Sequence, residues 1–172
     1  WKGELNDSNP CVTSCPSDDQ FKDFFDQALN SDEPTTLEHI TSETYVPVLD
    51  DPITELEVRE QVAHLKSEKA AGTDGIPPGV IRLLPATWIV FITIILNKLF
   101  LNSVYPQSWS LAKLFTIYKK GNKLLPSNYR GITIINCLAK VFDMILCHRL
   151  QLWFRPYREQ AGSQRGRGCL EH

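Results

Sequence analysis

Residues 111–135 read LAKLFTIYKKGNKLLPSNYRGITII, and this stretch decides the fold. Residues 111–118 and 129–135 are two runs that favour β-strands. The segment between them carries glycine, proline, asparagine and lysine residues, which are typical of a loop. We therefore predict a β-hairpin with a long tip.

Helical signals lie on both sides of this hairpin. Ser17 followed by Gln20 is a capping-box pattern, and Thr54 followed by Glu57 is a second one. Each pattern leads into apolar residues at helical spacing, so we predict a helix after each. The two stripes expected to be buried are Phe21, Phe24, Phe25 and Leu29, and Leu56, Val58, Val62 and Leu65.

Two longer helices are also expected. An apolar stretch predicts one at about 87–101, buried in a globular core and too short at 83–97 to span a membrane. The other is predicted from about 136 to 154, with one apolar face listed as Leu138, Val141, Phe142, Ile145, Leu146 and Leu150. The predicted class is α+β, mostly helical with a small antiparallel hairpin or sheet. Residues 69–78 contain glycines and two prolines, which predict an irregular turn.

Charge divides the chain unevenly. Residues 1–60 hold three Lys or Arg against fifteen Asp or Glu, whereas residues 61–172 hold fifteen against five. We predict an acidic, linker-like region with one helix at 1–52 and a basic domain at 53–172, whose charge suits a polyanion such as nucleic acid. Five scattered cysteines predict no disulfide framework and no zinc site, so an intracellular location, cytoplasm or nucleus, is expected.

The hairpin tip is the most informative feature. From residue 119 to residue 130 it carries Lys119, Lys120, Lys123 and Arg130 and no acidic residue. Lysine acts as a point charge and arginine as a planar fork, so such a set can hold a triphosphate. A solvated loop without a ligand is the alternative interpretation of the same residues.

Five motifs in order extend this interpretation, and they are Lys69 to Pro77, Pro106 to Trp109, Ile117 to Gly121, Asn128 to Ile132 and Glu159 to Gly168. Over about residues 50–172 the series resembles the fingers region of the reverse transcriptase of non-long-terminal-repeat (LINE-type) retrotransposons, a right-hand polymerase. The residues before 50 are similar in character to the linker that precedes this region in such elements.

The resemblance implies roles by position. Lys119 and Arg130 match the residues that hold the triphosphate of the incoming nucleotide, with Lys120 and Lys123 as helpers. The nucleic-acid-binding residues implied near the palm are Gly162, Arg165, Gly166, Arg167 and Gly168. Residues 72–77 match a motif that contacts template, although a loop that only orients the next helix fits them as well.

The carboxylates of nucleotidyl transfer are not expected in this chain. In the family they lie in the palm, downstream of these motifs, and hold the Mg²⁺ ions of the full-length enzyme. Asp50-Asp51 follows two apolar residues as in a polymerase signature, but we interpret it as a loop leading into the helix at Thr54. We therefore expect no catalytic residue, no metal site and no cofactor here, and no polymerase activity from this chain alone.

Three hypotheses follow from the sequence. The chain is a fingers fragment of an RNA-directed DNA polymerase, a nucleotidyltransferase whose partners are an RNA template, a DNA primer, a deoxynucleoside triphosphate and the missing palm domain, with no membrane. Alternatively, it is a non-catalytic module derived from such an element that binds nucleic acid or protein. The third hypothesis is a decayed copy that folds poorly.

Overall fold

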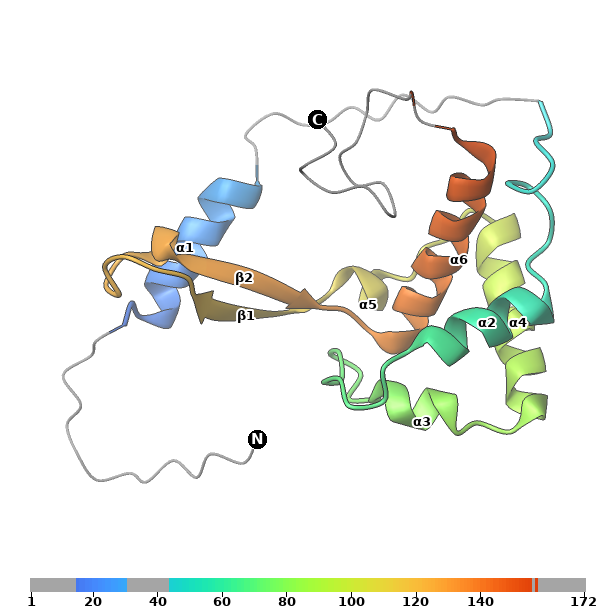
Figure 1. Ribbon diagram of the computed structural model, residues 1–172, viewed down its shortest axis with the longest axis horizontal. Helices are drawn as coiled ribbons and strands as arrows, with labels where there is room; N and C mark the ends of the chain where they lie inside the picture. The colour runs from blue at the N-terminus through green and yellow to red at the C-terminus, as the bar shows by residue number, and fades with distance from the viewer. Residues whose placement is uncertain (1–14, 31–43, 156, 158–172) are drawn as a thin grey trace. The chain divides into compact units, whose positions relative to one another are not determined.

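The computed structural model describes residues 15–30, 44–155 and 157, which form two compact units (Figure 1). We call residues 15–30 and 114–133 the hairpin unit. We call residues 44–113, 134–155 and 157 the helical unit. Together they contain helices and one two-stranded sheet, so the predicted α+β class is confirmed.

The described part of the helical unit contains five helices. They are α2 (Glu55–His64), α3 (Pro78–Arg82), α4 (Ala86–Leu101), α5 (Gln107–Ser110) and α6 (Cys137–Trp153). The capping box predicted at Thr54 forms in both directions with Glu57. The predicted irregular turn is also present, because Gly75 has a φ of 72° and α3 begins only at Pro78.

The core of the helical unit lies where α2 packs against α4 and α6, which lie together in Figure 1. The largest fully buried side chains come from these three helices and are Val58, Leu96, Val141 and Ile145. Burial of such a side chain contributes about 1.5–3 kcal/mol relative to leaving it in water. This core is therefore the main source of stability in the helical unit.

Three residues that were expected to be buried are exposed, and one of them is Leu29, at 73%. Leu56 is 64% exposed, because α2 buries Val58, Gln61 and Val62, and a residue two positions before Val58 points to the opposite face. Leu150 is 51% exposed. Arg149, four residues after Ile145, continues the buried stripe of α6 instead.

α4 was expected to lie inside the core, but only one of its faces does. Ile89, Ile92, Thr93 and Leu96 are buried, whereas Trp88 and Phe91 are 55% and 60% exposed. α2 covers one side of this helix, and apolar residues also occupy the other side. No helix in the described ranges has the length and apolar character needed to cross a membrane.

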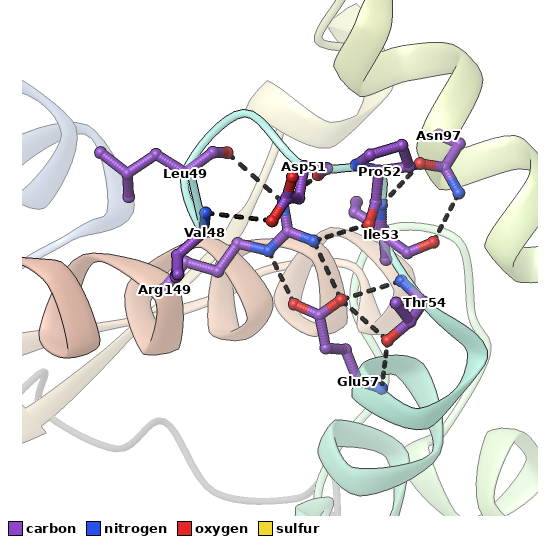
Figure 2. Close-up of polar contacts among 9 residues, drawn as sticks. All are labelled: Val48, Leu49, Asp51, Pro52, Ile53, Thr54, Glu57, Asn97 and Arg149. Atoms are coloured by element: carbon purple, nitrogen blue, oxygen red, sulfur yellow. Dashed lines mark hydrogen bonds and ion pairs between the residues drawn. The ribbon is translucent and has the colours of Figure 1, made fainter. Parts of the chain in front are cut away.

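The charged residue in the core is Arg149, which is 3% exposed (Figure 2). Its guanidinium donates to both carboxylate oxygens of Glu57, at 2.6 and 2.9 Å. It also donates to the backbone carbonyls of Asp51 at 2.5 Å, Pro52 at 3.0 Å and Leu49 at 3.4 Å. The buried charge is thus paired and hydrogen-bonded, which its burial requires.

Asn97 fixes the same segment from α4. Its amide donates to the Ile53 carbonyl at 2.7 Å and accepts from the Ile53 N–H at 2.7 Å (Figure 2). The chain before α2 is therefore held by side chains from two helices.

The hairpin unit contains α1 (Asp18–Leu29), β1 (Lys113–Tyr118), the 3₁₀ turn η1 (Pro126–Asn128) and β2 (Tyr129–Ile134), the outermost residue of each strand belonging to the helical unit. Ser17 and Gln20 form the predicted capping box at the start of α1. The two strands pair as the predicted hairpin with a long tip. The hairpin prediction is therefore confirmed within two residues at each strand boundary.

Candidate functional site

The hairpin has two different faces. The Lys119 N–H donates to the Asn128 carbonyl at 2.8 Å, and the rings of Tyr118 and Tyr129 lie 5.5 Å apart. This register places Ile117 opposite Arg130, and successive side chains on each strand alternate between faces. The two tyrosines therefore share one face, and Arg130 lies on the other.

α1 covers the face that carries the tyrosines. The Phe21 ring packs edge-on against Tyr129, with 4.8 Å between ring centroids. Phe25 lies against the backbone at Gly131. By alternation along β2, Tyr129 and Gly131 point toward α1, and Arg130 and Ile132 point away from it.

The face away from α1 is open and combines cations with apolar side chains. Lys119 and Arg130 are both exposed and, by the register, are diagonal neighbours on this face, which places their backbones about 7–8 Å apart. Phe115, Ile117 and Ile132 share the face and are 49%, 52% and 45% exposed. A polyphosphate could therefore contact both cations from the same side of the sheet.

Tyrosine hydroxyls hold the loop at the hairpin tip. The Tyr118 hydroxyl donates to the Gly121 carbonyl at 2.6 Å, and the Tyr129 hydroxyl donates to the Lys123 carbonyl at 2.9 Å. Gly121 has a φ of 94°, a conformation that favours glycine. The tip is therefore an ordered turn whose geometry depends on both tyrosines.

The two helper lysines have different positions. The Lys123 ammonium lies 5.6 Å from the centre of the Tyr118 ring, a cation–π distance. Lys120 is exposed and follows Lys119 directly. The strand register thus assigns Lys119 and Arg130 to one face, whereas Lys123 packs against a ring on the strand face that α1 covers.

The turn at 72–75 is held by a residue that sequence reasoning missed. The Asn136 side chain accepts hydrogen bonds from the Thr73 hydroxyl at 2.8 Å and from the Asp74 N–H at 3.2 Å. It also donates to the Ser108 carbonyl at 3.1 Å. A Cβ at Gly72 would lie 2.5 Å from the Asn136 amide oxygen, so only glycine fits there without a shift.

One feature of the sequence singled out Asn136. It directly precedes the apolar stripe of α6, which is the position of an N-cap. In the structure it has the N-cap position, but its side chain makes no capping hydrogen bond. Its amide holds the 72–74 turn instead.

A pocket of about 620 Å³ lies at the end of α2 and is partly basic. It is lined by residues 63–69 at the end of α2, together with Arg82 of α3. His64, Lys66 and Lys69 are among them, with Glu68 as the acidic member.

Asp50-Asp51 is part of a turn, as predicted. The Asp50 carboxylate accepts from the Val46 N–H at 2.6 Å, and the Asp51 carboxylate accepts from the Val48 N–H at 3.1 Å and from the Tyr45 hydroxyl. The hydrogen bond from Tyr45 is the main reason why the pKa of Asp51 is lowered. These carboxylates therefore stabilise a loop.

The predicted nucleic-acid-binding residues near the end of the chain stay a prediction. Gly162, Arg165, Gly166, Arg167 and Gly168 lie outside the described residues. Across 15–30, 44–155 and 157, no group of three or more His, Cys, Asp or Glu side chains could hold a metal ion.

Comparison with known proteins confirms the resemblance to the reverse transcriptases of non-long-terminal-repeat retrotransposons, although no protein-family model matches the chain. The chain is 27% identical over 129 residues to the probable RNA-directed DNA polymerase from transposon BS of Drosophila melanogaster, which covers 67% of the chain. It is 27% identical over 133 residues, or 77% of the chain, to the probable RNA-directed DNA polymerase from transposon X-element of the same species.

A third relative is the RNA-directed DNA polymerase from mobile element jockey of Drosophila funebris, 31% identical over 101 residues and 58% of the chain. The matches span 14%, 13% and 11% of these three relatives, respectively. The chain is thus similar to a short segment of non-long-terminal-repeat retrotransposon reverse transcriptases.

Proposed function

We propose that this chain is a fingers segment of a retrotransposon RNA-directed DNA polymerase and that its hairpin binds the triphosphate of the incoming nucleotide. The observation that carries the proposal is the common open face of Lys119 and Arg130 on the hairpin. The similarity to retrotransposon polymerases supports it, because a nucleoside triphosphate is the substrate of such enzymes.

The hairpin residues act by charge and position. The Arg130 guanidinium offers two parallel N–H groups to phosphate oxygens, and the Lys119 ammonium adds a point charge beside it. Together they neutralise the polyphosphate and orient it, and Lys120 adds charge at the edge of the tip. The catalytic carboxylates and Mg²⁺ of the full-length enzyme belong to the palm in this proposal, and this chain alone does not polymerise DNA.

Template contacts complete the proposal. The turn at 72–75, held by Asn136, and the segment 162–168 bind the RNA template or the primer–template duplex. Glycines in both segments allow a phosphodiester backbone to approach closely, and Arg165 and Arg167 neutralise it.

The direct test is binding of a deoxynucleoside triphosphate to this chain, followed by ³¹P NMR at low salt. We expect Arg130→Ala and Lys119→Ala each to weaken binding by about tenfold, since each removes a charge-assisted contact. Lys140→Ala is the matched control, because it removes one exposed cation from α6 in the helical unit. Equal affinity in all four proteins would contradict the proposed site.

A second measurement separates the proposal from the non-catalytic module. Primer–template duplex is titrated at several salt concentrations, because phosphate contacts make affinity fall steeply with salt. Salt-sensitive duplex binding without triphosphate binding would favour the module. In a longer relative that retains its carboxylates, substitutions at the matching Lys and Arg positions should raise the KM for nucleotide more than they lower kcat. Unchanged nucleotide kinetics would contradict the roles of both residues.

A further inference from the structure

The hairpin needs a partner in order to be ordered. A two-stranded hairpin alone is marginally stable in water, and packing against a helix is one way to stabilise it. In the described hairpin unit, α1 lies against the hairpin (Figure 1), and its contacts with β2 are those of Phe21 with Tyr129 and of Phe25 at Gly131. α1 and the hairpin tip are more than 80 positions apart in the sequence.

The contact at Gly131 is unusually close. A Cβ at this position would lie 3.0 and 3.1 Å from two atoms of the Phe25 ring and 2.9 Å from a methyl carbon of Leu114. The Phe25 ring therefore occupies the space that a side chain at 131 would need. Glycine weakens a strand, and an aromatic ring packed over it restores contacts that the strand lacks.

These contacts flank the two cations of the open face. Tyr129 and Gly131 are the neighbours of Arg130 on β2, and Tyr118, which packs on Tyr129, directly precedes Lys119. A strand held at the residues on both sides of Arg130 can present this side chain only on the opposite face. The position of α1 therefore determines the side from which the cations project.

We propose that α1 is a positioning element, which holds the hairpin through Phe21 and Phe25 so that Lys119 and Arg130 act together on a polyphosphate. The inference rests on the proposed function for its ligand. α1 itself touches no phosphate, and its aromatic residues act through Tyr129 and Gly131.

The first test is hydrogen exchange of the backbone amides of residues 114–133 in the full chain. Phe25→Ala should speed this exchange by about tenfold or more, because the state in which the hairpin is detached from α1 and its strand hydrogen bonds are broken becomes more populated. Amides of α2 and α6 should keep their protection. Leu29→Ala is the matched control, since this residue is on the same helix and 73% exposed. Unchanged exchange in Phe25→Ala would overturn the proposal.

The second test uses steric coupling between two positions. Gly131→Ala alone should speed hairpin exchange, because its methyl group meets the Phe25 ring. In the double variant Phe25→Ala with Gly131→Ala, the clash with the ring is gone and only the end of the flexible Leu114 side chain has to move, so the combined effect should be clearly smaller than the sum of the two single effects. Simple additivity would show that Phe25 does not fill the space at Gly131 and would overturn the proposed contact.

The third test measures tripolyphosphate affinity by calorimetry. Phe25→Ala keeps both cations, yet affinity should fall by about fivefold or more, and Phe25→Leu should recover part of it because an apolar side chain is restored. Wild-type affinity in Phe25→Ala would contradict the positioning role. If the wild-type chain does not bind tripolyphosphate, the proposed function and the positioning of a phosphate site fail together, whereas the exchange rates still decide whether α1 holds the hairpin.

Discussion

The two units of this chain have opposite characters. In residues 15–30, 44–155 and 157, thirteen apolar side chains other than proline are buried, and all of them belong to the helical unit, whereas the buried apolar residue of the hairpin unit is Pro16. The hairpin unit is held by partly exposed aromatic contacts, yet it carries the cations of the proposed binding site. Regions that bind ligands often have low local stability, and here that property follows from a sheet with one open face.

The largest effect should come from a charge placed in the helical core. Ile145 is 1% exposed, so Ile145→Asp buries an unpaired carboxylate and should cost about 4 kcal/mol or more, enough to unfold the helical unit. Leu150→Asp is the control, because Leu150 is on the same helix and half exposed. Thermal melting followed by circular dichroism distinguishes them, and equal melting temperatures would show that the buried face of α6 is assigned wrongly.

Loss of Arg149 should have the next largest effect. Arg149→Ala leaves Glu57 and three backbone carbonyls without their donor, so stability should fall by about 3 kcal/mol, as for other broken buried ion pairs. Arg149→Lys should recover little, because an ammonium lacks the planar fork.

The matched control is the exposed ion pair between Arg59 and Glu55, in which a guanidinium nitrogen and a carboxylate oxygen are 3.6 Å apart. Arg59→Ala should change stability by less than about 0.5 kcal/mol in the same urea denaturation. A similar loss in Arg59→Ala and Arg149→Ala would contradict the role given to the buried contacts.

Acidification should change the stability of the helical unit through two carboxylates, Glu57 and Asp143, whose effects are opposite. Burial raises the pKa of Glu57, but hydrogen bonds from Arg149 and Thr54 outweigh it, so the net pKa is lowered. Burial raises the pKa of Asp143, and a hydrogen bond from Tyr105 offsets this only in part. Glu57 therefore stabilises the fold above its unfolded pKa and loses this contribution as pH falls, whereas Asp143 destabilises the fold as pH rises.

Urea denaturation between about pH 3 and pH 7 measures both contributions. Glu57→Gln should flatten the loss of stability on the acid side, and Asp143→Asn should make it steeper. Parallel pH profiles for the two variants would show that these carboxylates do not govern the acid response.

The smallest effect should come from one hydroxyl of the hairpin tip. Tyr129→Phe removes the hydrogen bond to the Lys123 carbonyl at an exposed site, which is worth about 0.5–1 kcal/mol. Amides of residues 119–128 should exchange a few times faster, and the melting of the helical unit should not change. Tyr157→Phe, at a site 84% exposed, is the control. A lowered melting temperature of the helical unit in Tyr129→Phe would show that the two units are coupled.

Local patterns predicted most of the fold. The capping boxes at Ser17 and Thr54 and the strand boundaries of the hairpin depend on neighbouring residues, so a single sequence contains them. The burial of Arg149 depends on Glu57, 92 positions away, and on carbonyls that any residue could supply. The pattern of α6 therefore placed Leu150 in the core and omitted its neighbour.

The candidate site was predicted in composition but not in geometry. The cations of the tip are visible in the sequence, but the face of the hairpin on which each one lies depends on the strand register and on the conformation of the loop between the strands. Phe25 was part of a predicted apolar stripe, but its contact with Gly131 gave no signal, because a close contact between a helix and a distant strand has no local pattern. The role of Asn136 was missed for the same reason, since its partners Thr73 and Ser108 come from other segments.

The contacts of Arg149 also constrain the order of folding. They join residues 92 to 100 positions apart, so this cluster closes only after α6 has left the ribosome. Closing so long a loop costs entropy before any contact is gained, and contacts of high sequence separation slow folding. During synthesis, the face of α2 that packs on α6 therefore stays uncovered until α6 is made, and an uncovered apolar face favours aggregation of the nascent chain.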